Sequence, residues 1–93
     1  PGKFFEIEVD SLEQLKEALG LKPDLILLDN MSAKICEEAV AITAGSVKLE
    51  ASGGLTIENA KVYANTGVDY LAVGALTHSS PVLDIGLDFR KGK

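Results

Sequence analysis

Short apolar runs alternate with helix-like stretches along the whole chain. Residues 4–9 (FFEIEV) alternate apolar and acidic side chains, and this period of two predicts a β-strand. Residues 25–29 (LILLD), 47–51 (VKLEA) and 70–73 (YLAV) predict three more strands. The almost wholly apolar run at 25–29 is typical of a strand that is covered on both faces. The pattern therefore predicts a repeated order of strand and helix.

Each segment between these strands has residues that are typical of the start and the end of a helix. The residues expected to cap the helices at their N-termini are Ser11, which has capping-box spacing to Gln14, and Ser32 and Thr56. The glycines expected at their C-terminal ends are Gly20, Gly45 and Gly67. The faces expected to be buried comprise Leu12, Leu15, Ala18 and Leu19, then Ile35, Ala39 and Ile42, then Ile57, Ala60 and Ala64. A short helical turn is expected at 76–79, and an apolar patch follows at 82–87.

Connections of helix length between consecutive strands imply that the strands are parallel. A doubly wound sheet and part of a (β/α) barrel are the two main architectures for such a sheet. Alternation puts polar side chains on one face, namely Glu6, Glu8, Asp29, Lys48, Glu50, Ser52, Tyr70 and Gly74. It puts apolar ones on the other, namely Phe5, Ile7, Val9, Ile26, Leu28, Val47, Leu49, Leu71 and Val73. Because a doubly wound sheet needs apolar residues on both faces, we expect an α/β fold: a parallel four-stranded (β/α) partial barrel whose polar face is the lumen.

Length and composition limit what this half-barrel can be. The chain has 93 residues, 46% of them hydrophobic, as expected for one globular domain. Four strands cannot close a barrel and the chain starts at Pro1, so residues 1–93 are interpreted as a single half-barrel fragment of a longer protein. The net charge of −5 argues against nucleic acid as a partner, and no apolar run approaches the roughly 20 residues of a membrane helix. The single cysteine, Cys36, is interpreted as a packing residue and favours a cytoplasmic location.

Two glycine turns follow consecutive strands. Ser52-Gly53-Gly54 lies between a strand and a helix N-terminus, where bare backbone amides and the helix dipole favour an anion. A tight turn without a ligand is the alternative for this segment alone. Gly74-Ala75 follows the next strand, and paired glycine loops with an extra short helix are the usual phosphate site of barrel enzymes. The sole histidine, His78, lies four residues further on and is either an ordinary exposed residue or part of this phosphate site.

Acidic residues lie near the expected phosphate site. Asp29 ends an apolar strand, which is where barrel enzymes place catalytic groups, although Asp29-Asn30 is also good turn chemistry. Glu6 and Glu8 point to the polar face together with Glu50, so these carboxylates could hold Mg²⁺ through water or bind sugar hydroxyls. Solvated edge-strand charges, or a structural network neutralised by Lys48, would give the same pattern.

The strings EIEVDSLEQL, LILLDN, LEASGGLTIENA and TGVDYLAVGALTHS, in this order and spacing, resemble the C-terminal part of the quinolinate phosphoribosyltransferase family. The resemblance covers the chain from about Glu6 to Leu87. It implies a glycosyltransferase that, with Mg²⁺, transfers a phosphoribosyl group from phosphoribosyl pyrophosphate (PRPP) to quinolinate. The products are nicotinate mononucleotide for NAD biosynthesis, pyrophosphate and CO₂. It also implies an open, TIM-like barrel preceded by an α/β sandwich domain, in an assembly that is at least a dimer.

The resemblance assigns roles to residues of this sequence. Glu8 and Asp29 match the acidic pair near the PRPP ribose and its metal, which they could hold through water. The two phosphate loops match Ser52, Gly53 and Gly54, then Gly74 and Ala75, with His78 beside the second loop and Glu50 as a carboxylate of the lumen. The family's basic residues that grip the quinolinate carboxylates lie outside the matched part, so this chain is expected to be inactive alone.

Two other functions remain open from the sequence. One is another sugar-phosphate-binding barrel enzyme, an isomerase or aldolase, for which Lys48 is the lumen-facing candidate to form a Schiff base. The other is a half-barrel structural scaffold without activity, whose polar face and open sheet edges pair with a second copy.

Overall fold

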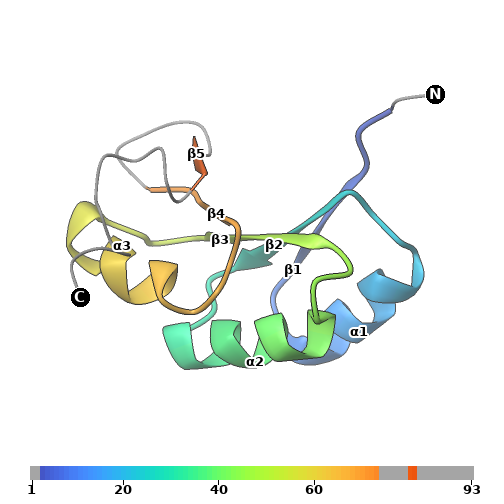
Figure 1. The fold of residues 1–93 in the computed structure, drawn as a ribbon, viewed down its shortest axis with the longest axis horizontal. Coiled ribbons are helices and arrows are strands. Elements are labelled where there is room, and N and C mark those ends of the chain that lie inside the picture. Colours follow the sequence, from blue (N-terminus) through green and yellow to red (C-terminus); the bar gives the residue numbers. More distant parts are fainter. Residues whose placement is uncertain (1–2, 74–79, 82–93) are drawn as a thin grey trace.

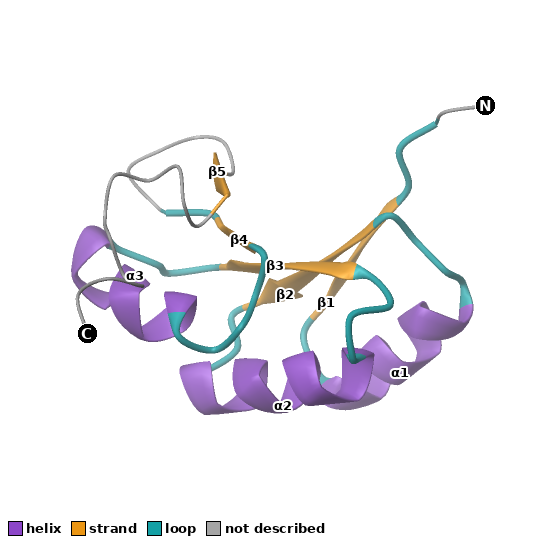
Figure 2. Cartoon of the chain, viewed as in Figure 1, coloured by secondary structure: helices purple, strands orange, loops and turns teal. Residues whose placement is uncertain are grey.

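The computed structural model of the chain describes residues 3–73 and 80–81. Its elements are β1 (Glu6–Val9), α1 (Leu12–Gly20), β2 (Leu25–Asp29), α2 (Ala33–Thr43), β3 (Lys48–Ser52), α3 (Ile57–Ala64), β4 (Tyr70–Leu71) and β5 (Ser80–Pro81). The strands form one sheet in chain order. Figure 1 shows α1, α2 and α3 along the same side of this sheet. The alternation of strands and helices predicted from the sequence is confirmed (Figure 2).

The strands β1 to β4 are parallel, as expected, but the sheet has a fifth strand. β5 pairs antiparallel with β4, with Tyr70 opposite Pro81 and Leu71 opposite Ser80. The sequence analysis missed this strand because two residues, one of them proline, carry no alternation. The helical turn expected at 76–79 and the apolar patch at 82–87 lie outside the described residues.

All three expected N-caps are confirmed. Ser11 Oγ accepts the Gln14 N–H at 3.1 Å, and Ser32 Oγ accepts the Ile35 N–H at 3.2 Å. At the start of α3, Thr56 and Asn59 form a full capping box, with the Asn59 side chain accepting the Thr56 N–H at 2.8 Å. These bonds satisfy amides that a helix N-terminus leaves without partners, and so they set where each helix begins.

The helix C-termini differ from the expectation at α1. Gly20 is the last helical residue, Leu21 follows in a right-handed conformation, and the left-handed residue is Lys22, with φ of 54°. Gly45 and Gly67 do adopt positive φ, although Ala44 is already left-handed before Gly45. The glycines therefore indicate roughly where each helix ends, but they do not identify the first residue with left-handed φ after α1 and α2.

The core lies between the sheet and the three helices. Its buried residues include Val9, Leu15, Ala18, Ile26, Leu28, Cys36, Ala39, Leu49, Ala51, Leu55, Ala60, Val68, Leu71 and Val73. The expected buried face of α3 is wrong at Ile57, which is 59% exposed. Leu55, just before the helix, is buried instead and fills the core at the N-terminal end of α3. Ile42, at the end of α2, is also exposed.

The opposite side of the sheet carries the polar residues, as the alternation predicts. The register aligns Glu6, Leu25 and Lys48 in one row, Glu8, Leu27, Glu50 and Tyr70 in the next, and Asp29 and Ser52 at the carboxyl ends of β2 and β3. We call this side the polar face. It is not wholly polar, because Leu25 and Leu27 of β2 lie in its first two rows.

Two aspartates fix the register of the parallel strands. Asp24, just before β2, accepts the Phe5 N–H at 2.8 Å through its carboxylate and donates its own N–H to the Phe5 carbonyl at 2.8 Å. Asp69, just before β4, makes the same pair of bonds with Leu49, each at 2.9 Å. These bonds align the strands so that their carboxyl ends meet at one edge. Within the described ranges, no helix has the length and apolar character to cross a bilayer.

Candidate functional site

Two carboxyl groups meet at the carboxyl end of the polar face. Glu8 comes from β1 and Asp29 from the last position of β2, and we call them the acidic pair. Asp29 raises the pKa of Glu8 above its ordinary value, first by charge repulsion and then through a hydrogen bond between the two carboxyl groups. Burial and Asp10 add smaller effects in the same direction. The pair therefore attracts a proton or a cation at this edge of the sheet.

The turn at 52–54, which we call the glycine turn, packs directly against Asp29. Gly53 has φ of +88°, and a Cβ built there would lie 2.7 Å from the Asn30 nitrogen and 2.8 Å from Asp29 Oδ1. Such distances are too short for a real side chain, so only glycine fits this position. The structure thus brings Asp29, Ser52 and Gly53 together, as the sequence analysis expected.

Only some of the backbone N–H groups near the glycine turn are free to bind an anion. The turn leads through Leu55 into α3, whose capping box uses the N–H groups of Thr56 and Asn59. The first amides of a helix have no partner within it, which leaves those of Ile57 and Glu58 beside the turn. The helix dipole adds partial positive charge at the same place. This arrangement fits a phosphate group.

The second expected phosphate loop, Gly74-Ala75, and His78 lie outside the described residues. The chain leading to them is described: β4 runs parallel to β3, and the Ala72 N–H donates to the Ala51 carbonyl at 3.0 Å. Val73 is buried in the core. The approach to Gly74 therefore runs toward the same edge as the glycine turn, and the roles of Gly74, Ala75 and His78 stay predictions.

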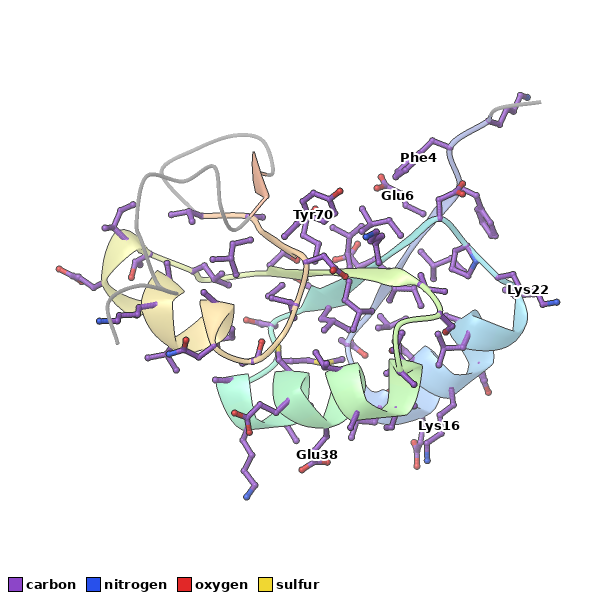
Figure 3. All side chains as sticks on the ribbon, viewed as in Figure 1. Phe4, Glu6, Lys16, Lys22, Glu38 and Tyr70 are labelled. Atoms are coloured by element: carbon purple, nitrogen blue, oxygen red, sulfur yellow. The ribbon has the colours of Figure 1, made fainter. Side chains whose placement is uncertain are left out.

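Glu50 lies on β3, two residues before Ser52 of the glycine turn. It is 3% exposed and shares a row with Glu8, with Leu27 between them. It borders a cavity of about 420 Å³ toward the amino ends of the strands, and Figure 3 shows Phe4, Glu6 and Tyr70 of this cavity on the side of the sheet opposite the helices. The cavity is acidic, since its charged lining residues are Glu6, Asp24, Glu50 and Lys48.

The carboxylates of the described residues form a pair and not a larger cluster. Within residues 3–73 and 80–81, no three His, Cys, Asp or Glu side chains are grouped to hold a metal ion. Mg²⁺ is nevertheless usually bound through one or two carboxylates together with substrate phosphates and water. Glu8 and Asp29 beside the glycine turn match the protein part of that donor set, so the residues present fit an Mg²⁺ ion that arrives with a phosphorylated substrate.

Two other reactive side chains, Cys36 and Lys48, were considered from the sequence. Cys36 is fully buried, and burial raises the pKa of its thiol to about 11, so it stays protonated and packs in the core as expected. Lys48 starts β3, whereas Ser52 ends it. Four residues of strand separate the two by about 13 Å, which disfavours a Schiff-base lysine acting on a sugar phosphate held at the glycine turn.

Sequence reasoning missed Asn30. The sequence pattern indicates Asn30 only as a turn partner of Asp29, but its N–H donates to the Ser52 carbonyl at 2.8 Å and its backbone has φ of 62°. Its place directly after Asp29 at a strand end was the available signal, because asparagine tolerates left-handed φ better than most residues.

The repulsion in the acidic pair has a cost in stability. Glu8→Gln is expected to raise the urea midpoint of unfolding at pH 7, because the pKa of Glu8 is higher in the folded than in the unfolded chain. Such a group destabilises the fold above its folded pKa, and the penalty disappears as the pH falls through that value toward the unfolded one. The gain should therefore shrink as the pH is lowered from 7 to 4.

The exposed Glu17 of α1 provides the control for this prediction. Glu17→Gln should change the free energy of unfolding by no more than about 0.5 kcal/mol at either pH. A Glu8→Gln protein that is less stable than the wild type at pH 7 would contradict the assignment of a repulsive pair.

The geometry defines a class of protein. A parallel sheet with its helices on one side, a polar face on the other and an acidic pair beside a glycine turn at the strand ends is a (β/α) half-barrel with a site suited to a phosphate and a cation. Comparisons with known proteins identify the family within that class. The family model described as quinolinate phosphoribosyl transferase, C-terminal domain, matches residues 2–88.

Individual relatives agree with this match. The chain is 62% identical over 86 residues to the nicotinate-nucleotide pyrophosphorylase [carboxylating] of Mycobacterium leprae, covering 89% of this chain and 30% of that protein. It is 40% identical over 83 residues to the probable nicotinate-nucleotide pyrophosphorylase [carboxylating] of Bacillus subtilis, covering 89% of this chain and 29% of that protein. The solved structure of the Francisella tularensis nicotinate-nucleotide pyrophosphorylase aligns with a TM-score of 0.76 at 38% identity, covering 86% of this chain and 29% of that one.

The chain therefore belongs to the family of the quinolinate phosphoribosyl transferase C-terminal domain. The expected resemblance and the partial-barrel fold are both confirmed. The chain spans about 30% of the length of the curated relatives that it matches.

Proposed function

We propose that this chain supplies the PRPP-binding part of a nicotinate-nucleotide pyrophosphorylase (carboxylating). That enzyme transfers the phosphoribosyl group of PRPP to quinolinate and releases pyrophosphate and CO₂, giving nicotinate mononucleotide for NAD biosynthesis. One observation carries the proposal: Asp29 Oδ1 lies 2.8 Å from the place where Gly53 would have a side chain, so the acidic pair and the glycine turn form one continuous site. The names of the relatives support the same activity.

The described residues divide the work of holding PRPP. The glycine turn and the N-terminus of α3 would bind one phosphate group, and Gly74, Ala75 and His78 complete phosphate binding in the proposal. Glu8 and Asp29 would lie at the ribose and hold Mg²⁺, which supplies positive charge against the pyrophosphate leaving group. Positive charge develops at ribose C1 as pyrophosphate leaves, and the two carboxylates are suited to stabilise it.

Quinolinate needs groups that lie beyond this site. It carries two carboxylates, whereas the cavity of the polar face has Glu6, Asp24 and Glu50 against the single Lys48. Such a lining repels a dianion. The proposal therefore places the basic residues for quinolinate in other parts of a longer enzyme or in a second subunit of a homo-oligomer. A cytoplasmic location belongs to the proposal too, supported by the free cysteine Cys36.

The chain alone is expected to bind PRPP with Mg²⁺ but not to turn over. Titration calorimetry with PRPP and Mg²⁺ should give a saturable binding curve. A steady-state assay with quinolinate, PRPP and Mg²⁺ should show no nicotinate mononucleotide above the background rate. Turnover by the isolated chain would contradict the proposed division of labour, and absence of PRPP binding would contradict the proposed function itself.

A further inference from the structure

Asn30 has an uncommon backbone conformation at the edge of the proposed site. Its φ of 62° is left-handed, which the structure shows at only two other non-glycine residues within the described ranges, Lys22 and Ala44. The Asn30 N–H donates to the Ser52 carbonyl at 2.8 Å. This bond extends the pairing of β2 and β3 by one residue beyond the partners Asp29 and Ser52.

The left-handed turn brings the backbone of Asn30 against the glycine turn. The Asn30 nitrogen lies 2.7 Å and its Cα 3.1 Å from the place of a Cβ on Gly53, and Asp29 Oδ1 lies 2.8 Å from the same place. Three atoms of the Asp29–Asn30 segment thus occupy the space that a side chain on Gly53 would need. Asn30 follows Asp29 directly, and the bond from its N–H to the Ser52 carbonyl holds the peptide between the two residues beside the glycine turn.

We infer that Asn30 is a positioning residue: its left-handed backbone, held by the bond to Ser52, fixes the Asp29 carboxylate against Gly53. In this way it joins the acidic pair and the glycine turn into one site. The ligand of that site rests on the proposed function, whereas the placement of Asp29 rests on the contacts described above. The Asn30 side chain is exposed, so the inference concerns its backbone conformation.

Substitutions at Asn30 separate backbone conformation from side-chain chemistry. Valine strongly disfavours left-handed φ, whereas glycine adopts it freely. Asn30→Val should weaken the binding of PRPP with Mg²⁺ about tenfold, as measured by titration calorimetry. Asn30→Gly should bind within about twofold of the wild type, although it lacks the amide side chain. Asn30→Ala should fall between them, and Ala44, with φ of 53°, shows that this fold accepts alanine in that conformation.

Lys22 offers a matched control because it has nearly the same backbone conformation, with φ of 54°, in the connection between α1 and β2. That connection precedes the amino end of β2, whereas Asn30 follows its carboxyl end. Lys22→Val should lower stability as Asn30→Val does but leave PRPP binding unchanged. Equal weakening of binding by both variants would overturn the inference, because it would show a general effect of strain.

A second readout needs no ligand. In the otherwise wild-type chain, Asp29→Asn should shift the Gly53 amide resonance in an ¹⁵N–¹H spectrum, because Asp29 Oδ1 lies 2.8 Å from the place that a Cβ on Gly53 would occupy. The same shift should persist in the Asn30→Gly and Lys22→Val backgrounds and be lost in the Asn30→Val background. A Gly53 response that is intact in Asn30→Val overturns the inference, whether or not PRPP binds. A wild-type protein that shows the response but fails to bind PRPP contradicts the proposed function alone and leaves the positioning role supported.

Discussion

Replacing Gly53 by alanine is expected to lower the free energy of unfolding by about 3 kcal/mol. Two costs combine at this position. The backbone has φ of +88°, a conformation that alanine disfavours. The new Cβ would also lie 2.7 Å from the Asn30 nitrogen, and this backbone atom cannot move away as a flexible side chain could. Urea unfolding followed by circular dichroism measures the loss.

Gly54 is the matched control, since it is the next residue in the same turn. Its φ is +74°, but a Cβ there would meet nothing within 4 Å. Gly54→Ala should therefore cost only the strain of its conformation, about 1 kcal/mol. Equal losses for the two variants would show that the contact with Asp29 and Asn30 is not what restricts Gly53.

Asp29→Asn is expected to weaken the binding of PRPP with Mg²⁺ about thirtyfold to a hundredfold while making the protein more stable. The amide keeps the shape of the side chain but removes the charge that would hold a cation. It also removes the charge that raises the pKa of Glu8, so the folded state is relieved of a repulsion at pH 7. A residue with a purely structural role would not separate these two effects.

Asp24→Asn is the control at the other end of β2. Asp24 lies directly before the strand and accepts the Phe5 N–H, whereas Asp29 is the last residue of the strand. Asp24→Asn should leave PRPP binding unchanged in calorimetry. If Asp29→Asn binds as tightly as the wild type, Asp29 does not belong to the site.

Much of the fold is readable from local pattern. Residues 25–29 are predicted as a strand with the same limits that the structure gives to β2, and Ser11, Ser32 and Thr56 cap helices as expected. The polar and apolar faces follow from alternation because one register satisfies both. These features depend on neighbours in the sequence, which is why the sequence reveals them.

Features that depend on distant residues were not predicted. β5 exists through its pairing with β4, and Lys22 adopts a left-handed conformation although Gly20 was the better local candidate. Ile57 is exposed, whereas Leu55 just before the helix is buried in the core. Each is decided by packing between elements, which a local pattern does not report.

Some residues of the candidate site could be predicted from the sequence, and the place of others depends on the fold. Asp29 and the glycine turn are predicted from residue types at strand ends, and Glu8 from its place on the polar face and the family resemblance. The structure brings them together. Glu50 shares a row with Glu8, two strands away, and borders the acidic cavity, so its role as a carboxylate of the lumen stays a prediction. Alternation shows that residues share a face, whereas the number of strands between them decides which of them meet.

The central claim is that the acidic pair and the glycine turn form one binding site for PRPP. Amide chemical-shift mapping of the chain during titration with PRPP and Mg²⁺ tests this claim most directly. If the acidic pair and the glycine turn bind this ligand together, the largest shifts will fall on Glu8, Asp29, Gly53 and Gly54, and residues of the acidic cavity such as Glu6 and Lys48 will change little. Shifts confined to that cavity, or no saturable shifts at all, would contradict a PRPP site at the carboxyl ends of these strands.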